Sequence, residues 1–147
     1  MRTIPFVKYT SFGNNFVIID EIHSPVLTEE EKSTFAYHAT NQNFGVGADN
    51  FIVIQSFRSL TLAQVNEHRR YWDQAPHSDG VDFIFRMFEP DGNEAYSCAN
   101  GLMCVMKYLN QTYDYHSVSV MTEIPTAAPK VITAGIESKT SRTWINL

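Results

Sequence analysis

Apolar runs at the start of the chain predict two strands joined by a tight turn. Residues 4–9 and 16–20 are rich in aromatic and β-branched side chains, which favour strands. The segment between them, SFGNN, contains glycine and asparagine, which tolerate the positive φ angles of tight turns. The same reasoning predicts later strands at residues 51–57, 117–122, 131–134 and 143–147, with a short one in the segment EAYSC.

Two segments in the first half of the chain have helical patterns. Thr28 is followed three residues later by Glu31, the capping-box spacing, and acidic residues fill the turn between them. This helix is expected to end between residues 40 and 43. A second helix is predicted within residues 60–74, because apolar residues recur at positions 62, 65 and 72.

The segment ANGLMCVMKYLNQTY, residues 99–113, predicts an almost wholly enclosed helix. Its apolar residues cover a broad surface, and Lys107 is its only charged residue. A helix this apolar is normally surrounded by protein. Before it, the segment VDFIFRMFE predicts a strand with one well-buried face, marked by Phe83 and Phe85.

These elements predict the fold class. They indicate an α+β domain in which a mixed or antiparallel sheet wraps around a central buried helix. The 147 residues are 44% hydrophobic and 18% charged, which fits one folded domain over residues 1–147.

Composition and charge narrow the range of partners. The formal net charge is −5, and no basic stripe is present that could neutralise phosphates, so a nucleic-acid partner is not expected. The cluster HRR at residues 68–70 is interpreted as a solvated helix face. No apolar run reaches the roughly 20 residues of a membrane-spanning helix, and the N-terminus has no signal-peptide pattern. We therefore expect a cytoplasmic protein without a membrane partner.

The two cysteines, Cys98 and Cys104, stand in different settings. Six residues along a helix correspond to a rise of about 9 Å, which is too far for a disulfide between them. Cys104 falls among core positions of the predicted helix. Cys98 lies at the helix N-terminus, where free N–H groups and the helix dipole favour a thiolate and can hold an anion. From the residues alone, Cys98 is either a small core side chain or an acid/base group that removes an α-proton.

Three motifs together resemble a known family. The segments KYTSFGNNFVIID, FGVGAD and FEPDGNEAYSCANGLMC, in this order and spacing, resemble the N-terminal half of diaminopimelate epimerase. The similarity covers nearly the whole chain, apart from an extra stretch at residues 59–79. Enzymes of that family belong to the lysine and cell-wall pathway. The resemblance implies two similar lobes, each with strands around a central helix and one catalytic cysteine at its N-terminus.

The resemblance also implies a mechanism and a set of site residues. One thiolate removes the α-proton of an amino acid while the opposite thiol delivers a proton, without pyridoxal phosphate or metal. Cys98 would be the acid/base group of this lobe. Asn100 and the backbone of Ala99 and Gly101 would hold the substrate's α-carboxylate.

Further substrate contacts are expected from the remaining motifs. Asn14 and Asn50 occupy positions that would contact substrate. Glu89 stands where the family commonly has a substrate-contacting asparagine. A carboxylate there would repel the distal carboxylate of diaminopimelate, so either Glu89 points away or the substrate differs at its far end.

Other positions also depart from the family pattern. Ala99 replaces the glycine that usually follows the catalytic cysteine, and its methyl group could crowd the carboxylate. Asn15 replaces an aspartate, and Met103 replaces an arginine.

One lobe supplies only one catalytic cysteine, so a C-terminal lobe is expected as the missing partner. Two alternatives stay open. One is a related isomerase of the same fold, similar to proline racemase or to phenazine-biosynthesis proteins, with a different substrate. The other is a non-catalytic binding domain of half the size, pairing as a homodimer through the apolar residues 144–147.

Several weaker signals point to no site of their own. The glycines of GVG at residues 45–47 do not extend to a nucleotide-binding motif, and they are interpreted as a turn lining the cleft. The five histidines lack metal-ligand spacing, so no metal is expected. The serine in SFGNNF has no histidine or aspartate partner at the spacing a serine hydrolase would need.

Overall fold

The fold, seen in a computed structural model, is a curved sheet with one helix inside it and two outside. The structure describes residues 1–77 and 79–147. The strands follow the order β1-β2-β3-β4-β6-β7-β8, and β5 pairs with β4. The strand bounds are β1 Val7–Ser11, β2 Asn14–Glu21, β3 Asn50–Ser56, β4 Phe83–Phe88, β5 Glu94–Ala95, β6 Ser117–Thr122, β7 Lys130–Ile136 and β8 Thr143–Asn146. The helices are α1 Glu29–Ala39, α2 Ser59–Arg69 and α3 Ala99–Tyr113.

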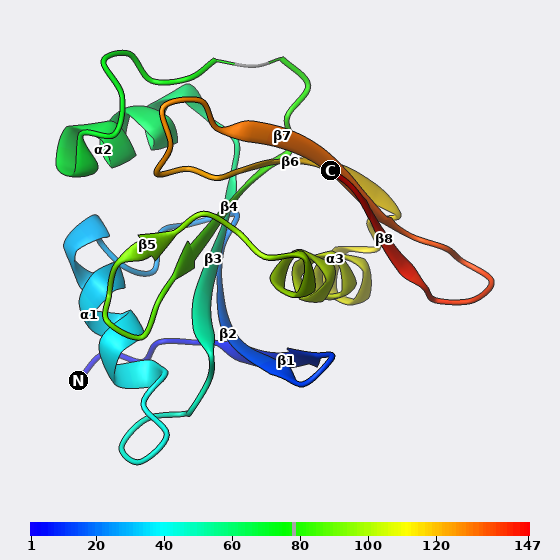
Figure 1. Cartoon of the computed structure of the whole chain (residues 1–147), viewed down its shortest axis with the longest axis horizontal. Helices are drawn as coiled ribbons and strands as arrows, with labels where there is room; N and C mark the ends of the chain where they lie inside the picture. The colour runs from blue at the N-terminus through cyan, green and yellow to red at the C-terminus, as the bar shows by residue number, and fades with distance from the viewer. Residues whose placement is uncertain (78) are drawn as a thin grey trace.

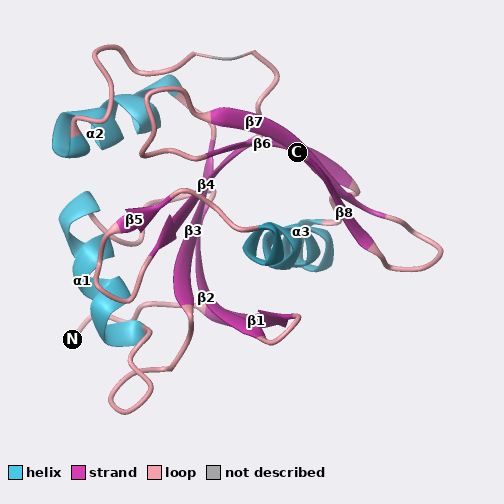
Figure 2. Cartoon of the chain, viewed as in Figure 1, coloured by secondary structure: helices cyan, strands magenta, loops and turns pink. Residues whose placement is uncertain are grey.

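The sheet bends around α3, as Figures 1 and 2 show, while α1 and α2 lie on its outer face. Strands β2 and β3 are parallel, as are β4 and β6, and the other pairs are antiparallel. Parallel neighbours need long crossover connections, and here α1 joins β2 to β3 while α3 lies between β4 and β6. The predicted α+β fold with a mixed sheet around a central buried helix is confirmed.

Local sequence explains most element boundaries. The predicted capping box is present. The Thr28 side chain accepts a hydrogen bond from the Glu31 N–H, and the Glu31 carboxylate accepts one from the Thr28 N–H. The first hairpin turns at Phe12 and Gly13, with φ of 48° and 85°. Two consecutive positive φ angles are typical of the two-residue turns that fit twisted strands.

Some predicted boundaries need correction. The first strand begins at Val7 rather than at residue 4, and Pro5, which lacks an N–H, precedes it. The second helix ends at Arg69, because Arg70 adopts a left-handed conformation with φ of 58°. Trp72, expected on that helix, lies beyond it. The segment unmatched by the family motifs, residues 59–79, includes Ser78, which lies outside the described residues.

Strand β4 was expected to bury one face, and this prediction was wrong. All six residues of β4 are buried. Phe83 and Phe85 pack in the core around α3, while Phe88 packs against residues of α1 on the outer side. Alternation fails as a signal here because both faces of the central strands are covered by helices.

A buried network of charges joins α1 and α2 to the outer face of the sheet. The Arg86 side chain is fully buried and pairs with Glu29 and with Glu94, whose side chain is 1% exposed. Lys32 pairs with Glu21 at 3.2 Å and with Glu29 at 3.4 Å. Arg69 is the third cation of this network, which therefore contains three positive and three negative side chains.

The interpretation of residues 68–70 as a solvated face holds for His68 and Arg70, which are exposed, but not for Arg69. Its guanidinium donates to the Glu29 carbonyl oxygen at 2.8 Å and to the Ser33 hydroxyl at 3.1 Å. The side chain is only 16% exposed. The carboxylate that pairs with it comes from a different helix, and local sequence does not reveal such a partner.

The network predicts a large stability cost for Arg86→Met. Methionine fills a similar volume but leaves Glu94 buried without its cation. Breaking a buried ion pair in this way costs about 3–5 kcal/mol, measurable by urea unfolding. Arg2→Met, at the exposed pair with Glu31, is the control and should cost less than about 1 kcal/mol. Equal costs for both variants would contradict this account of the network.

A second prediction concerns acid stability. Burial alone would raise the pKa of Glu29, but the charges and hydrogen bonds of Arg86, Lys32 and Arg69 outweigh it and lower that pKa to about 2. An unfolded glutamate titrates near ~4.3. The folded pKa is therefore depressed, and the stability it contributes is complete above about pH 5 and is lost as pH falls toward 2.

Urea midpoints measured from pH 6 to pH 3 check this dependence. Glu29→Gln should reduce the decrease of the urea midpoint at low pH, because the titrating carboxyl group is gone. Glu30→Gln, at the exposed neighbouring position on α1, should keep the wild-type slope. A Glu29→Gln curve as steep as wild type would rule out the proposed origin of the acid sensitivity.

Candidate functional site

Cys98 caps the N-terminus of α3, as predicted. Its backbone is extended, with φ of −145°, and its Sγ accepts a hydrogen bond from the Gly101 N–H at 3.2 Å. The side chain is half-buried against the core. The thiol therefore lies among the first N–H groups of a fifteen-residue helix, where negative charge is favoured.

The surroundings of Cys98 act on its thiol in opposite directions. Burial raises the pKa, and the N–H groups of Gly101 and Asn100 lower it, while the negative charge of Glu89 raises it. The net direction is upward, because burial dominates. The N–H groups at the helix end act in the direction expected from the sequence, but burial opposes them and has the larger effect on the pKa.

Cys104 is a core residue, as predicted. It is 4% exposed and packs in the cluster around α3. Burial raises the pKa of its thiol to about 11. Both cysteines are free, in agreement with the prediction that they do not bridge each other.

Asn14 and Asn100 meet beside the first turn of α3. The Asn100 side-chain amide donates to the side-chain Oδ1 of Asn14 at 2.7 Å. The Asn14 amide in turn approaches Asp49 at 3.5 Å, and the Asn15 N–H donates to Asp49 at 2.8 Å. This arrangement ties the β1–β2 hairpin to the loop before β3.

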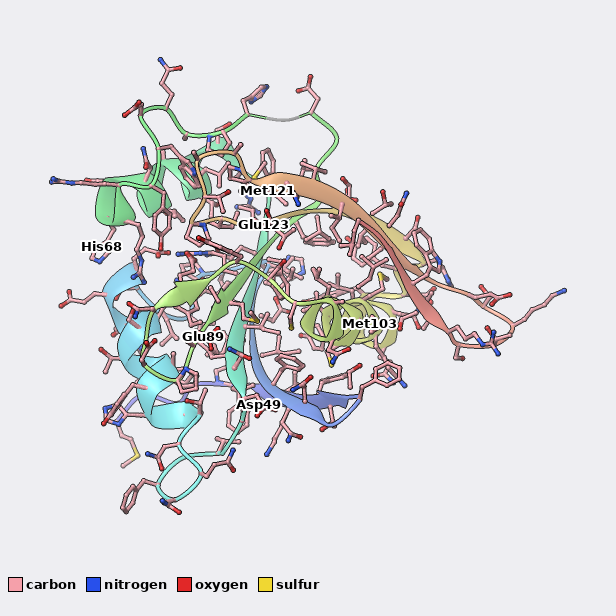
Figure 3. All side chains as sticks on the ribbon, viewed as in Figure 1. Asp49, His68, Glu89, Met103, Met121 and Glu123 are labelled. Atoms are coloured by element: carbon pink, nitrogen blue, oxygen red, sulfur yellow. The ribbon has the colours of Figure 1, made fainter. Side chains whose placement is uncertain are left out.

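Asp49 was not among the predicted site residues. It is the last residue of the motif FGVGAD, so the motif indicated this position. Its role is apparent only from its contact with the hairpin in the structure. In Figure 3, Asp49 lies at the start of β3, beside β2. Asp49 is a positioning residue, because its carboxylate fixes Asn14 and the backbone of Asn15.

Glu89 is exposed and directly follows β4. The Asn50 amide donates to its carboxylate at 2.9 Å and also reaches the Phe88 carbonyl oxygen at 3.4 Å. The negative charge of Glu89 raises the pKa of the Cys98 thiol. Asn50 and Glu89 thus form a second pair beside the site, at adjacent ends of β3 and β4.

The space around Gly101 is tight, while Ala99 is exposed. A Cβ at Gly101 would lie 3.1 Å from the Cys98 Sγ and 3.1 Å from Ile52. Glycine at this position therefore lets the thiol approach the helix backbone. Ala99 sits at the first helical position with its methyl group in an exposed setting.

Three exposed aromatic side chains lie close in sequence to the site residues. Phe12 precedes Asn14 in the hairpin, Phe44 lies in the loop that ends at Asp49, and Tyr96 stands two residues before Cys98. They are 86%, 93% and 63% exposed. Each loop that carries a site residue therefore also presents an apolar side chain to solvent.

The described residues contain no group of three or more His, Cys, Asp and Glu side chains arranged to hold a metal ion. No described helix is long and apolar enough to cross a membrane.

Similarity to solved structures defines the fold class first. The crystal structure of a Bacillus anthracis phenazine biosynthesis protein of the PhzF family matches with a TM-score of 0.56. The match covers 97% of this chain and 38% of that chain, at 19% identity. The protein is thus an α+β lobe of this fold.

Sequence similarity then identifies the family. The model of the family described as diaminopimelate epimerase matches residues 6–124, so the chain belongs to this family of isomerases. The diaminopimelate epimerase of Methanocaldococcus jannaschii is 35% identical over 104 residues, covering 71% of this chain and 29% of that protein. That of Azoarcus sp. is 30% identical over 138 residues, covering 92% of this chain and 42% of that protein. The chain thus spans about a third of the length of such relatives.

The raised pKa of Cys98 predicts slow alkylation at neutral pH. The rate with iodoacetamide should rise with pH and reach its midpoint above the ordinary cysteine value of ~8.5. Glu89→Gln should lower the midpoint, because it removes a negative charge near the thiol. Cys98→Ser is the control and should leave only the slow reaction of the buried Cys104. A wild-type midpoint below ~8 would contradict the dominance of burial.

Proposed function

We propose that the chain is the N-terminal lobe of a cofactor-independent amino-acid epimerase that interconverts LL- and meso-diaminopimelate in lysine and peptidoglycan biosynthesis. The observation that carries this proposal is the position of Cys98, a half-buried thiol at the N-cap of α3 in a chain of this family. The matches cover only 29% and 42% of two relatives named diaminopimelate epimerase, so a C-terminal lobe would complete the cleft.

The proposed chemistry needs two acid/base groups on opposite sides of the α-carbon. A thiolate on one lobe takes the α-proton, and the carbon-bound electron pair then takes a proton from the thiol on the other lobe. The configuration inverts, and the two cysteines exchange protonation states. With the raised pKa that burial gives it, Cys98 is suited to start as the thiol that delivers the proton.

The residues around Cys98 are suited to hold the substrate's α-carboxylate. The first N–H groups of α3, from Ala99, Asn100 and Gly101, carry the partial positive charge of the helix end. The same groups would stabilise the negative charge that develops when the α-proton leaves. Asn14 would hold Asn100 in place through their hydrogen bond.

Contact with a second lobe is the proposed role of Phe12 and Phe44, the exposed aromatic side chains of the loops that carry Asn14 and Asp49. Covering these side chains would remove apolar surface from water. It would also exclude water from the thiol and strengthen the interaction of the helix end with the substrate.

Two other candidates draw on specific observations. Glu89 supplies a negative charge next to Asn50, which favours a substrate with a different far end, as in a related isomerase of this fold. Strand β8 ends the strand order of the described sheet and carries Trp144, 43% exposed. A half-size binding domain could form a homodimer through this edge.

The test of the proposed function is α-proton exchange by the full-length protein in deuterium oxide. Cys98→Ala should reduce the exchange of diaminopimelate by at least about 10³-fold, the size of a lost acid/base group. Cys104→Ala should cost about 1–2 kcal/mol of folding stability and leave the exchange rate per folded molecule unchanged. Exchange by Cys98→Ala at the wild-type rate would refute the assignment.

A further inference from the structure

The carboxylate of Asp20, on β2, is held by hydroxyl groups of α3 rather than by a cation. One of its oxygens accepts hydrogen bonds from the hydroxyls of Tyr108, at 2.6 Å, and of Tyr113. The other oxygen accepts from the Ile22 N–H at 2.8 Å. None of the ion pairs formed by residues 1–77 and 79–147 includes Asp20. Hydrogen bonds to a carboxylate are strong, so this contact ties the C-terminal half of α3 to β2.

The two hydroxyl groups keep their protons well into the alkaline range. Burial, followed by the hydrogen bond and charge of Asp20, raises the pKa of Tyr113 to about 12. The same causes raise the pKa of Tyr108. Both side chains therefore remain hydrogen-bond donors to the carboxylate at neutral pH.

The same face of β2 also contacts the first turn of α3. Alternate residues of a strand point to the same side, and Asn14, Phe16 and Asp20 all contact the helix. The Asn14 Oδ1 accepts the hydrogen bond of Asn100, and a Cβ at Gly101 would lie 3.4 Å from the Phe16 ring. Strand β2 therefore holds α3 near both of its ends.

The spacing of these contacts agrees on the two elements. From Asn14 to Asp20 the strand rises about 20 Å, at roughly 3.3 Å per residue. From Asn100 to Tyr113 the helix also rises about 20 Å, at roughly 1.5 Å per residue. Helix and strand thus run side by side, with hydrogen bonds at each end of the shared length. A shift of α3 along its axis by one residue, about 1.5 Å, would stretch the bonds at both ends.

We propose that Asp20 is a positioning residue for Cys98. By holding the two tyrosines it fixes α3 along its axis, and the helix carries this constraint to the thiol at its other end. The hydrogen bond between Asn14 and Asn100 then stays closed, and the thiol keeps its place relative to the hairpin. That this place serves proton transfer rests on the proposed function, whereas the fixed register of α3 does not.

A displaced helix would affect binding and proton transfer differently. The N–H groups proposed to hold the α-carboxylate belong to α3, so they move together with Cys98, and substrate binding would change little. The acid/base group of the other lobe does not move with α3. Misplacement of a reacting group by about 1 Å can cost about 100-fold in rate. Loss of the Asp20 contact should therefore lower kcat more than it raises KM.

The side-chain amide of Asn100 reports the register of α3 from the opposite end of the helix. Its NMR signals in the folded 147-residue chain are compared between wild type and the double variant Tyr108→Phe/Tyr113→Phe, which loses both hydroxyls and keeps both rings. The signals should shift toward those of a free asparagine amide, because the bond to Asn14 lengthens.

Two further variants keep this test decisive. Tyr115→Phe removes a hydroxyl from the same aromatic cluster that is not bonded to Asp20. It should leave the Asn100 signals unchanged. Tyr113→Phe alone removes one of the two bonds at a half-buried position and should give a smaller shift in the same direction. It takes the place of the double variant if that variant does not fold.

The same variants in the full-length protein test the consequence for proton transfer. The double variant should lower kcat for α-proton exchange of diaminopimelate about 10- to 100-fold, with KM within about twofold of wild type. Tyr115→Phe should keep the wild-type kcat.

Other results overturn a defined part of the account. Unchanged Asn100 signals together with a lower urea midpoint would show that Asp20 only adds stability, and would refute its positioning role. Shifted signals with an unchanged kcat would refute the link to proton transfer. If the wild-type full-length protein exchanged no diaminopimelate, the proposed function would be refuted, while the Asn100 signals would still decide whether Asp20 sets the register of α3.

Discussion

The burial of α3 inside the curved sheet is the constraint on which the rest of the structure depends. The helix contacts strands at both ends of the strand order, β1 and β2 on one side and β7 and β8 on the other. This enclosure fixes where the helix begins, and therefore where Cys98 lies. A thiol at the first turn of a loosely held helix would have neither the burial that raises its pKa nor a fixed relation to Asn14 and Glu89.

The outer face of the sheet is held in a different way. Three cations and three carboxylates are buried between the sheet and the outer helices, centred on Arg86. Such a network costs desolvation energy, but it specifies one arrangement of α1 and α2 on the sheet. Strands β3 and β4 are covered on both faces. Asn50 begins β3 and Glu89 follows β4, so this polar pair lies at the end of the two covered strands.

Local patterns predicted the elements, whereas contacts between distant segments decided the details. The capping box, the first hairpin and the position of Cys98 at the start of α3 each depend on a few neighbouring residues, and all three were predictable. The burial of both faces of β4 and the pairing of Arg69 depend on helices far away in sequence. The same holds for Asp49, whose bonds to the hairpin were not predictable, and for Glu89, whose direction could not be read from its neighbours.

The central claim is that Cys98 is one of two acid/base groups on two lobes of a single epimerase. The most direct measurement is to read the coding sequence downstream of the codon for Leu147. The account predicts that it stays open for a similar or greater length and encodes a second cysteine block of the type Cys-Gly-(Ser/Thr)-Gly. A stop codon at this point would leave a single acid/base cysteine per chain and would contradict the two-lobe account.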